Sequence, residues 1–271
     1  MPLSIGGRPP EEQGIRVIHA ALDSGFTLID TADVYCFDDH DIGHNERLIA
    51  KALKQRSGTR DQVIVATKGG LTRPGGRWER QGDPAHLRLA CDRSLKALGV
   101  ERIDLYQLHA PPNAVPFADS VGTLGGLQRD GKIRWIGLSN VSVQEIDEAN
   151  ETVKVVTVQN RLSPFFREAL SGAVVAHCAV KGIGFLAYSP VGGGRLNLKL
   201  PAHPVLAAIA RRHGASAHAV AIAWGMAQGP TVIPIPGART VEHAKDSASS
   251  AGITLTRAEL AEIDQADFSR A

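Results

Sequence analysis

Short apolar runs rich in β-branched residues alternate along this chain with stretches of helical periodicity. Seven such runs occur, at residues 26–31, 63–68, 103–109, 133–139, 155–159, 183–188 and 231–234. Their hydrophobicity is nearly continuous, which is typical of strands buried on both faces of a sheet. The alternation therefore predicts a parallel sheet with helices packed against it.

Local signals mark the ends of the intervening helices. Residues 9–12 place two prolines and two glutamates at a helix start, and Gly25 ends that helix. Asp83 and Pro84 have the positions of an N-cap and a first helical residue, and Gly99 follows the last apolar position. The apolar residues between these signals are expected to pack in the core.

An open, doubly wound sheet would show the same alternation of strands and helices. The first run, however, is not followed by the G-x-G-x-x-G pattern of that fold, and the number of runs is close to eight. We therefore predict a (β/α)8 barrel. Because no linker or abrupt change of composition divides the chain, we expect residues 1–271 to form one domain.

Composition and charge exclude several classes of partner. Lys and Arg number 30 against 28 Asp and Glu, so a formal charge of +2 gives no reason to expect nucleic acid as a partner. Cys36, Cys91 and Cys178 lie far apart without C-x-x-C spacing, which suits a reducing compartment. No stretch approaches the roughly 18 apolar residues of a membrane-spanning helix. We expect a cytoplasmic protein without a membrane partner, either a monomer or a small homo-oligomer.

Polar residues end most of the predicted strands. In a barrel of this kind the catalytic groups lie at the carboxyl ends of the strands, so these residues are candidates for chemistry. They are Asp30 with Tyr35 five residues later, Lys68, His109, Ser139 with Asn140, Gln159 with Asn160, and Tyr188 with Ser189. We expect all of them on one face of the barrel.

Seven motifs at these positions resemble those of the aldo-keto reductase superfamily. They are IDTADVY at 29–35, ATK at 66–68, LHAP at 108–111, GLSN at 137–140, VQN at 158–160, AYSPVGGG at 187–194 and VIPIPGAR at 232–239. They follow the order of the family, and the resemblance extends from about residue 14 to the C-terminus. It implies an NADPH-dependent enzyme that reduces a small aldehyde or ketone to an alcohol.

The resemblance implies a catalytic tetrad of Asp30, Tyr35, Lys68 and His109, with Tyr35 as the proton donor. A phenol with a pKa of about 10 is a slow acid at neutral pH, and an adjacent ammonium lowers that pKa by favouring the phenolate. We therefore expect Lys68 to lower the pKa of Tyr35. Asp30 can hold Lys68 charged, and His109 can form a hydrogen bond to the substrate oxygen.

The resemblance also assigns the cofactor site. Ser139, Asn140 and Gln159 would bind the nicotinamide carboxamide, which both donates and accepts hydrogen bonds. Tyr188 would stack on the nicotinamide ring, and Ser189 and Gly192 would approach the pyrophosphate. The residues assigned to the adenosine end are Gly237, Arg239, His243, Asp246 and Ser247. A guanidinium there suits a 2′-phosphate, so NADPH is preferred to NADH.

The chain departs from the family pattern at its start. Relatives precede the first helix with a β-hairpin and a complete first strand, whereas only residues 1–7 stand here. Either residues 2–5 pair partly in the position of strand one, or the sequence is a truncated form of a longer product. We expect the partial pairing, in a barrel whose strand one and N-terminal hairpin are shortened or missing.

Substrate choice and rival functions remain as hypotheses. Trp78 stands between Arg73, Arg77 and Arg80, which favours an aromatic or anionic carbonyl substrate of a pyridoxal-like kind. A barrel that binds NADPH without efficient turnover is the alternative function. A metal-dependent hydrolase that uses Asp30 and His109 fits less well, because no H-x-H or H-E-x-x-H pattern occurs and Lys68 would repel a cation. No metal ligand is expected.

Overall fold

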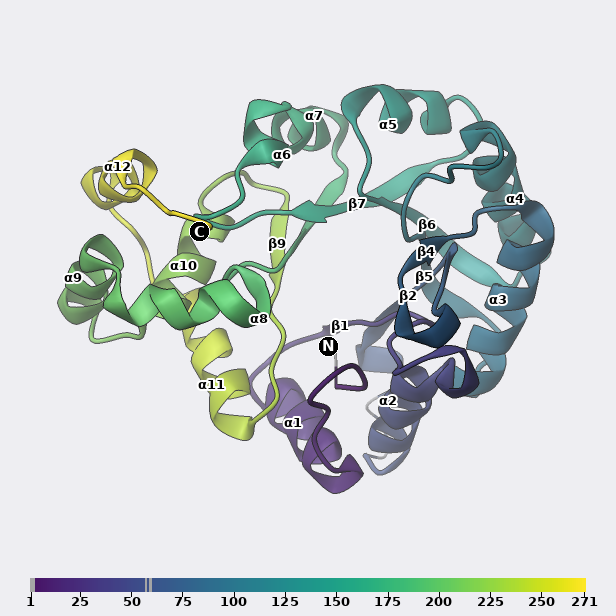
Figure 1. The fold of residues 1–271 in the computed structure, drawn as a ribbon, viewed down its shortest axis with the longest axis horizontal. Coiled ribbons are helices and arrows are strands. Elements are labelled where there is room, and N and C mark those ends of the chain that lie inside the picture. The colour runs from purple at the N-terminus through teal and green to yellow at the C-terminus, as the bar shows by residue number, and fades with distance from the viewer. Residues whose placement is uncertain (1–2, 57, 59) are drawn as a thin grey trace.

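Seven parallel strands form a nearly closed barrel in the computed structural model, which describes residues 3–56, 58 and 60–271. The strands follow one another in the sheet in the order of the chain (Figure 1). They are β1 (Leu28–Asp30), β2 (Ile64–Gly69), β5 (Ile103–Leu108), β6 (Ile133–Ser139), β7 (Val155–Arg161), β8 (Gly184–Tyr188) and β9 (Val232–Ile235). Each lies within two residues of the run that predicted it.

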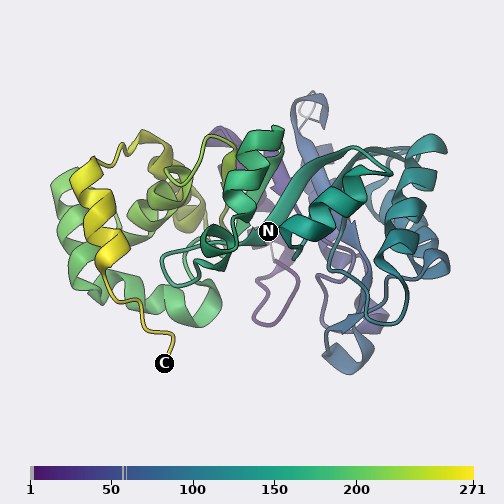
Figure 2. The ribbon, with the colours of Figure 1, turned by 90° about the horizontal axis from the view of Figure 1, so that it is seen from above.

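Helices surround this sheet, as Figure 1 shows. Along the chain they are α1 (Glu11–Asp23), α2 (His44–Lys54), α3 (Pro84–Leu98), α4 (Phe117–Arg129), α5 (Val143–Asn150), α6 (Glu168–Ser171), α7 (Val174–Lys181), α8 (Gly193–Leu196), α9 (Pro204–His213), α10 (Ala217–Met226), α11 (Val241–Ser249) and α12 (Arg257–Gln265). In Figure 2, α12 lies beside α9 at one side of the molecule and leads into the C-terminal tail. No helix within the described residues is both long and apolar enough to cross a membrane.

The helix-end signals act as predicted. The Asp83 side chain accepts a hydrogen bond from the backbone N–H of His86 at 3.0 Å, and Pro84 is the first residue of α3. Gly99 ends that helix at a φ of 66°, a left-handed conformation that costs glycine little. Pro10 likewise precedes α1, which ends before Gly25. These ends fix where the chain leaves each helix to enter the next strand.

Apolar residues fill both sides of the sheet. A large cluster packs the outward faces of the strands against the helices, and a small one formed by Ala66, Leu105 and Leu186 fills the barrel interior. Alternate residues of a strand face the same side, so the residues two positions further along, Lys68 and Gln107 among them, lie one layer higher in the interior. The upper layer of the interior is therefore polar.

The N-terminal segment does not form the expected strand. Within the described residues, Leu3 to Ile5 have no strand conformation and β1 and β9 have no strand between them; Pro2 lies outside the described residues. The segment is nevertheless packed, because Leu3 and Ser4 are buried. The Ser4 hydroxyl donates to Oδ1 of Asn45 at 2.9 Å, and Arg239 donates to the Gly6 carbonyl at 2.8 Å. Side chains from the first turn of α2 and from the loop between β9 and α11 thus hold the N-terminal segment in place of strand pairing.

Leu3→Ala tests whether this segment stabilises the barrel. Leu3 is 1% exposed, so its truncation should lower the free energy of unfolding by about 2 to 5 kcal/mol through lost apolar contacts and a cavity. Urea denaturation measures this loss. Leu198→Ala, at a side chain that is 76% exposed, is the control and should change little. Equal effects of the two substitutions would mean that the segment is not packed.

Candidate active site

A buried ion pair lies at the carboxyl ends of β1 and β2. Lys68 Nζ is 2.6 Å from Oδ2 of Asp30 and also donates to the carbonyl oxygen of Thr31 at 2.7 Å. The hydroxyl of Tyr35 lies 3.5 Å from the same ammonium. Lys68 is fully buried and Asp30 is 6% exposed. A single buried cation therefore contacts both the carboxylate and the phenol of the predicted tetrad.

The second oxygen of Asp30 accepts hydrogen bonds from two glutamines. Nε2 of Gln159 donates to Oδ1 at 2.7 Å and Nε2 of Gln107 donates to it at 3.1 Å. Both amides are buried in the upper interior layer. Because a carboxylate with several charge-assisted donors is satisfied in a dry interior, these amides stabilise the charged form of Asp30.

Sequence reasoning missed Gln107. The alternation of side chains along β5 could have identified it, because Gln107 stands two residues before His109 and therefore faces the same interior. Gly137 on the next strand provides the space, because an added Cβ there would lie 2.8 Å from Cγ of Gln107. A side chain at Gly137 would push Gln107 away from Asp30.

Lys68 lowers the pKa of Tyr35 as expected, but the net shift of that pKa is upward, so the expected gain in acidity is wrong. Burial raises the pKa of Tyr35 above its ordinary value, and the nearby charge of Lys68 lowers it only in part. For Lys68, burial alone would lower the pKa, but Asp30 and Tyr35 outweigh it and raise that pKa. Tyr35 is therefore protonated and Lys68 is charged at neutral pH.

His109 completes the tetrad as a neutral imidazole. Burial, followed by the repulsion of Lys68, lowers its pKa well below the ordinary value. The rings of Tyr35, Trp78 and His109 contact one another edge to face, with centroids 6.0 to 6.4 Å apart. These three rings form an aromatic wall around the place where Tyr35 and His109 can meet a substrate oxygen.

Trp78 belongs to a loop with a small hairpin of β3 (Leu71–Thr72) and β4 (Glu79–Arg80). The guanidinium carbon of Arg73 lies 3.9 Å from the Trp78 ring centroid, and its Nη2 donates to the carbonyl oxygens of Cys36 and Phe37. Arg73 therefore contacts both Trp78 and the segment that follows Tyr35, and holds the two together. The other two arginines are engaged elsewhere: Arg77 with Glu79, and Arg80 with Asn113 and the Pro111 carbonyl.

The residues assigned to the nicotinamide form one hydrogen-bonded group. Oγ of Ser139 donates to the backbone carbonyl of Gln159 at 2.9 Å. Asn140 donates to the carbonyl oxygen of His109 at 3.0 Å and accepts from the hydroxyl of Tyr188 at 2.8 Å. Since Nε2 of Gln159 bonds to Asp30, its Oε1 is the atom left for a ligand. The group offers both acceptors and donors, as a carboxamide requires.

The residues assigned to the phosphates and the adenosine follow β8 and β9 in the chain, and the last three lie in α11. Asn140 and Ser189 have φ of 60° and 51°, two of the three left-handed residues other than glycine among those described. Gly192 has a φ of 87° and begins α8. The remaining assigned residues are Gly237, Arg239 and His243, which are exposed, and Asp246 and Ser247, which are half-buried.

Arg239 and His243 lie at the start of the nine-residue helix α11. Two guanidinium nitrogens of Arg239, Nε and Nη1, have no hydrogen bond within the described part of the chain. Backbone N–H groups at a helix start and free guanidinium donors suit an anion. Asp246 is already engaged, because its carboxylate accepts from Ser216 at 2.7 Å. This end of the site fits the phosphate of a nucleotide.

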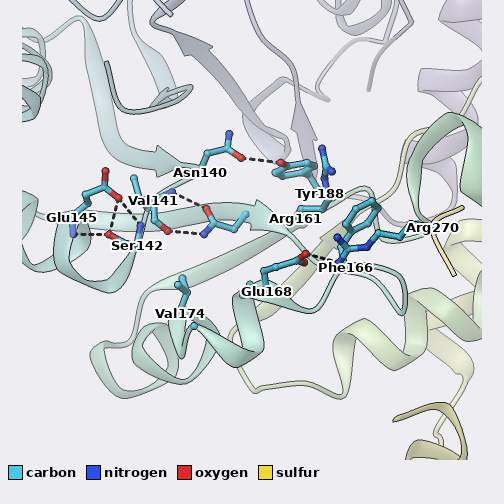
Figure 3. A pocket seen from close by; sticks show the side chains of 13 residues that line it. Asn140, Val141, Ser142, Glu145, Arg161, Phe166, Glu168, Val174, Tyr188 and Arg270 are labelled. Atoms are coloured by element: carbon cyan, nitrogen blue, oxygen red, sulfur yellow. Dashed lines mark hydrogen bonds and ion pairs between the residues drawn. The ribbon is translucent and has the colours of Figure 1, made fainter. Parts of the chain in front are cut away.

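A cavity of about 670 Å³ adjoins the nicotinamide residues at Asn140 and Tyr188. The end of β7, the first turns of α5, α6 and α7 with the loops before them, and the C-terminal tail line the rest of it (Figure 3). In the part of the chain that the structure describes, no group of three or more His, Cys, Asp or Glu side chains is placed to hold a metal ion.

Known proteins resemble this chain in both sequence and fold. The model of the aldo/keto reductase family matches residues 3–267. A probable aldo-keto reductase of Glycine max is 34% identical over 94% of this chain and 80% of its own. Among solved structures, a glycerol dehydrogenase of Gluconobacter oxydans has a TM-score of 0.81 at 29% identity, covering 94% of this chain and 85% of its own. An aldo-keto reductase of Klebsiella pneumoniae in complex with NADPH has a TM-score of 0.79 at 26% identity, covering 94% and 84%.

A double-mutant cycle measures the coupling within the ion pair. Lys68→Met removes the ammonium that is 2.6 Å from the buried Asp30 carboxylate, so we expect a loss of about 3 to 5 kcal/mol in the free energy of unfolding. Asp30→Asn leaves Lys68 unpaired in the same way. The double variant should lose much less than the sum of the two, as urea denaturation would show. Additive losses would mean that the two charges act independently.

Proposed function

This chain belongs to the aldo/keto reductase family, and we propose that it reduces an aldehyde or ketone to an alcohol with NADPH as the hydride donor. The observation that carries this proposal is the position of Lys68 Nζ, which contacts both Asp30 and the hydroxyl of Tyr35. Asp30 and the Thr31 carbonyl already accept hydrogen bonds from the Lys68 ammonium, so the nearby phenol is not required to stabilise this buried cation. The cation does stabilise a phenolate formed beside it.

Each tetrad residue has one task in this reaction. Tyr35 gives its proton to the carbonyl oxygen, and Lys68 stabilises the negative charge that then develops on Tyr35. Asp30, held by Gln107 and Gln159, keeps Lys68 charged and fixed in place. Neutral His109 forms a hydrogen bond to the carbonyl oxygen beside Tyr35. The carbonyl carbon would take its hydride from NADPH held by the cofactor residues, and this hydride together with the proton from Tyr35 would give the alcohol.

The cofactor residues are proposed to act as the sequence motifs imply. Ser139, Asn140 and Gln159 would hold the carboxamide, and Tyr188 would stack on the nicotinamide ring. Ser189 and Gly192 would meet the pyrophosphate. Gly237, Arg239, His243, Asp246 and Ser247 would surround the adenosine end, with Arg239 on the 2′-phosphate. The complex of the Klebsiella pneumoniae relative with NADPH supports the choice of cofactor.

The aromatic wall favours a planar carbonyl substrate. Trp78 is 49% exposed and its ring lies 6.4 Å from that of Tyr35, so it can cover a flat molecule bound at the tetrad. Arg77 and Arg80 bind neighbouring protein groups, whereas Nε and Nη1 of the buried Arg73 have no hydrogen-bond partner within the described residues. Of the three arginines near Trp78, Arg73 alone therefore keeps donors that could meet an anionic group.

Tyr35→Phe tests the proposed reaction. NADPH oxidation, followed by nicotinamide absorbance over a panel of carbonyls that includes pyridoxal and nitrobenzaldehyde, should fall by about 100-fold or more without the proton donor. NADPH binding, measured by fluorescence, should be unchanged. If the wild-type chain binds NADPH but reduces none of the panel, the alternative of a barrel without turnover is favoured.

The pH profile provides a separate check of the two pKa shifts. Tyr35 donates a proton only below its pKa, which burial raises above about 10, and the pKa of His109 lies well below about 6.5. Neither group changes charge between about pH 6 and 8. The wild-type kcat for reduction should therefore be flat over this range. An inflection near pH 6.5 would show that His109 titrates during catalysis.

Arg239→Ala tests the cofactor preference. Loss of charge-assisted bonds to a 2′-phosphate should raise the KM for NADPH about 10-fold to 100-fold. The KM for NADH should stay within about twofold. Loss of the hydrogen bond from Arg239 to Gly6 would affect both cofactors alike, so an unchanged KM for NADH shows that this loss is not the cause. Arg129→Ala on α4 is the matched control. Equal effects on both cofactors would exclude Arg239 as the residue that selects NADPH.

A further inference from the structure

The ring of Trp78 lies at the tetrad although its own loop gives it little support. The hairpin of β3 and β4 has two residues in each strand, and its turn passes through Gly75 and Gly76 with φ of 53° and 83°. So short a hairpin is marginal by itself, and Trp78 is 49% exposed. The ring nevertheless contacts the rings of Tyr35 and His109, with centroids 6.4 and 6.3 Å away. The hairpin alone does not explain why the ring stays there.

Arg73 supplies the missing support. Its guanidinium carbon lies 3.9 Å from the centroid of the Trp78 ring. Nη2 of the same guanidinium donates to the carbonyl oxygens of Cys36 at 3.3 Å and Phe37 at 3.0 Å. These two residues follow Tyr35 directly in the chain. Arg73 therefore joins the ring beside the tetrad to the segment that carries the proposed proton donor.

The guanidinium of Arg73 is buried with part of its hydrogen-bonding capacity unused. Arg73 is 6% exposed and is the one buried arginine among the residues that the structure describes. Its Nε and Nη1 are shielded from solvent and have no acceptor within the described residues. Burying a cation in this state destabilises the fold, and an apolar side chain would fill the same space without this penalty. Packing alone therefore does not account for an arginine at this position.

An arginine here can either hold the Trp78 ring or bind an anionic group of the substrate with its free donors. The burial of Nε and Nη1 favours the first role, because a substrate that enters from solvent would have to displace the groups that cover them. Asp38, which directly follows Phe37, would also repel an anion near this guanidinium. The contacts that Arg73 does make, to the ring and to the two carbonyls, are those that the first role requires.

We propose that Arg73 is a positioning residue that holds the Trp78 ring against Tyr35 and His109, and that it thereby makes the site select aromatic over saturated carbonyl substrates. This inference rests on the proposed reductase function and adds a specificity-determining residue to it. The guanidinium lies over the indole while its Nη2 bonds to the carbonyls. A lysine cannot make both contacts in this way, because an ammonium has no flat face. A ring held in this position can pack against a planar substrate at the tetrad.

Benzaldehyde and cyclohexanecarbaldehyde test the inference, because they share a carbon skeleton and differ in planarity. Arg73→Lys should lower kcat/KM for benzaldehyde by about 3-fold to 10-fold, through KM, since the substrate loses an aromatic contact. The value for cyclohexanecarbaldehyde should change by less than about twofold, which also shows that the variant is folded. Arg77→Lys is the matched control. Arg77 directly precedes Trp78, but its exposed guanidinium pairs with Glu79, so its replacement should alter neither substrate.

A double-mutant cycle shows whether Arg73 acts through Trp78. Trp78→Ala should reproduce the loss on benzaldehyde, and Arg73→Lys added to it should cause no further loss. Losses that multiply in the double variant would overturn the inference, because Arg73 would then act by another route. A loss confined to 4-carboxybenzaldehyde, with benzaldehyde unaffected by Arg73→Lys, would also overturn it and would assign Arg73 to an anionic group of the substrate.

Two measurements without turnover separate this inference from the reaction itself. The fluorescence of Trp78, taken as the difference between each chain and its Trp78→Ala form, reports the exposure of the ring through quenching by acrylamide. Arg73→Lys should raise the quenching constant by up to about twofold, because the held ring is 49% exposed. Calorimetry in the presence of NADP⁺, which has no hydride to give, should find benzaldehyde bound about 3-fold to 10-fold more weakly by this variant. An unchanged quenching constant would reject the positioning role, while absence of turnover alone would reject only the proposed function.

Discussion

The buried pair of Lys68 and Asp30 requires the barrel to be curved and nearly closed. Two charges in a dry interior are tolerated only when their remaining hydrogen-bonding capacity is satisfied. Here the satisfying groups come from strands far apart in the chain: Gln107 on β5 and Gln159 on β7 both donate to one oxygen of Asp30 on β1. In a flat sheet β7 could not reach across to β1. The same curvature brings Ser139, Asn140 and Tyr188 to the rim above this pair, so the residues proposed for catalysis and those proposed for cofactor binding depend on the same curved sheet.

The N-terminal segment contributes to that rim in an unexpected way. Rather than adding a strand between β1 and β9, it crosses the loops at the carboxyl ends of the strands. Arg8 forms an ion pair with Asp41 at 2.7 Å and stacks on Phe37, while the Gly6 carbonyl holds Arg239. One short segment therefore contacts both the loop that follows Tyr35 and the loop that carries the proposed phosphate ligand. Leu3 and Ser4 are buried, and their contacts replace part of the packing that a strand between β1 and β9 would provide.

The residues at strand ends were predictable, because apolar runs locate parallel strands and the polar residue after each run must lie on one face. Gln107 was not found, although the alternation of β5 points it inward. The acidity of Tyr35 was predicted in the wrong direction, since the sequence shows that Lys68 is near but not how completely the phenol is removed from water. The arginines around Trp78 were expected to be available to a ligand, but Arg77 and Arg80 bind neighbouring protein groups, whereas Nε and Nη1 of Arg73 have no hydrogen-bond partner within the described residues.

The order of strands and helices and the family followed from the sequence, because hydrophobic periodicity and short motifs depend on residues close together in the chain. The partners of Asp30, the net pKa shifts, the path of residues 3–8 and the contacts of Arg73 were decided by the tertiary structure alone. Each depends on contacts between strands and loops separated by tens of residues, as in the bond from Gln159 to Asp30 across 129 positions. Burial and hydrogen bonding at such contacts are properties of the packed barrel, and no local pattern of residues contains them.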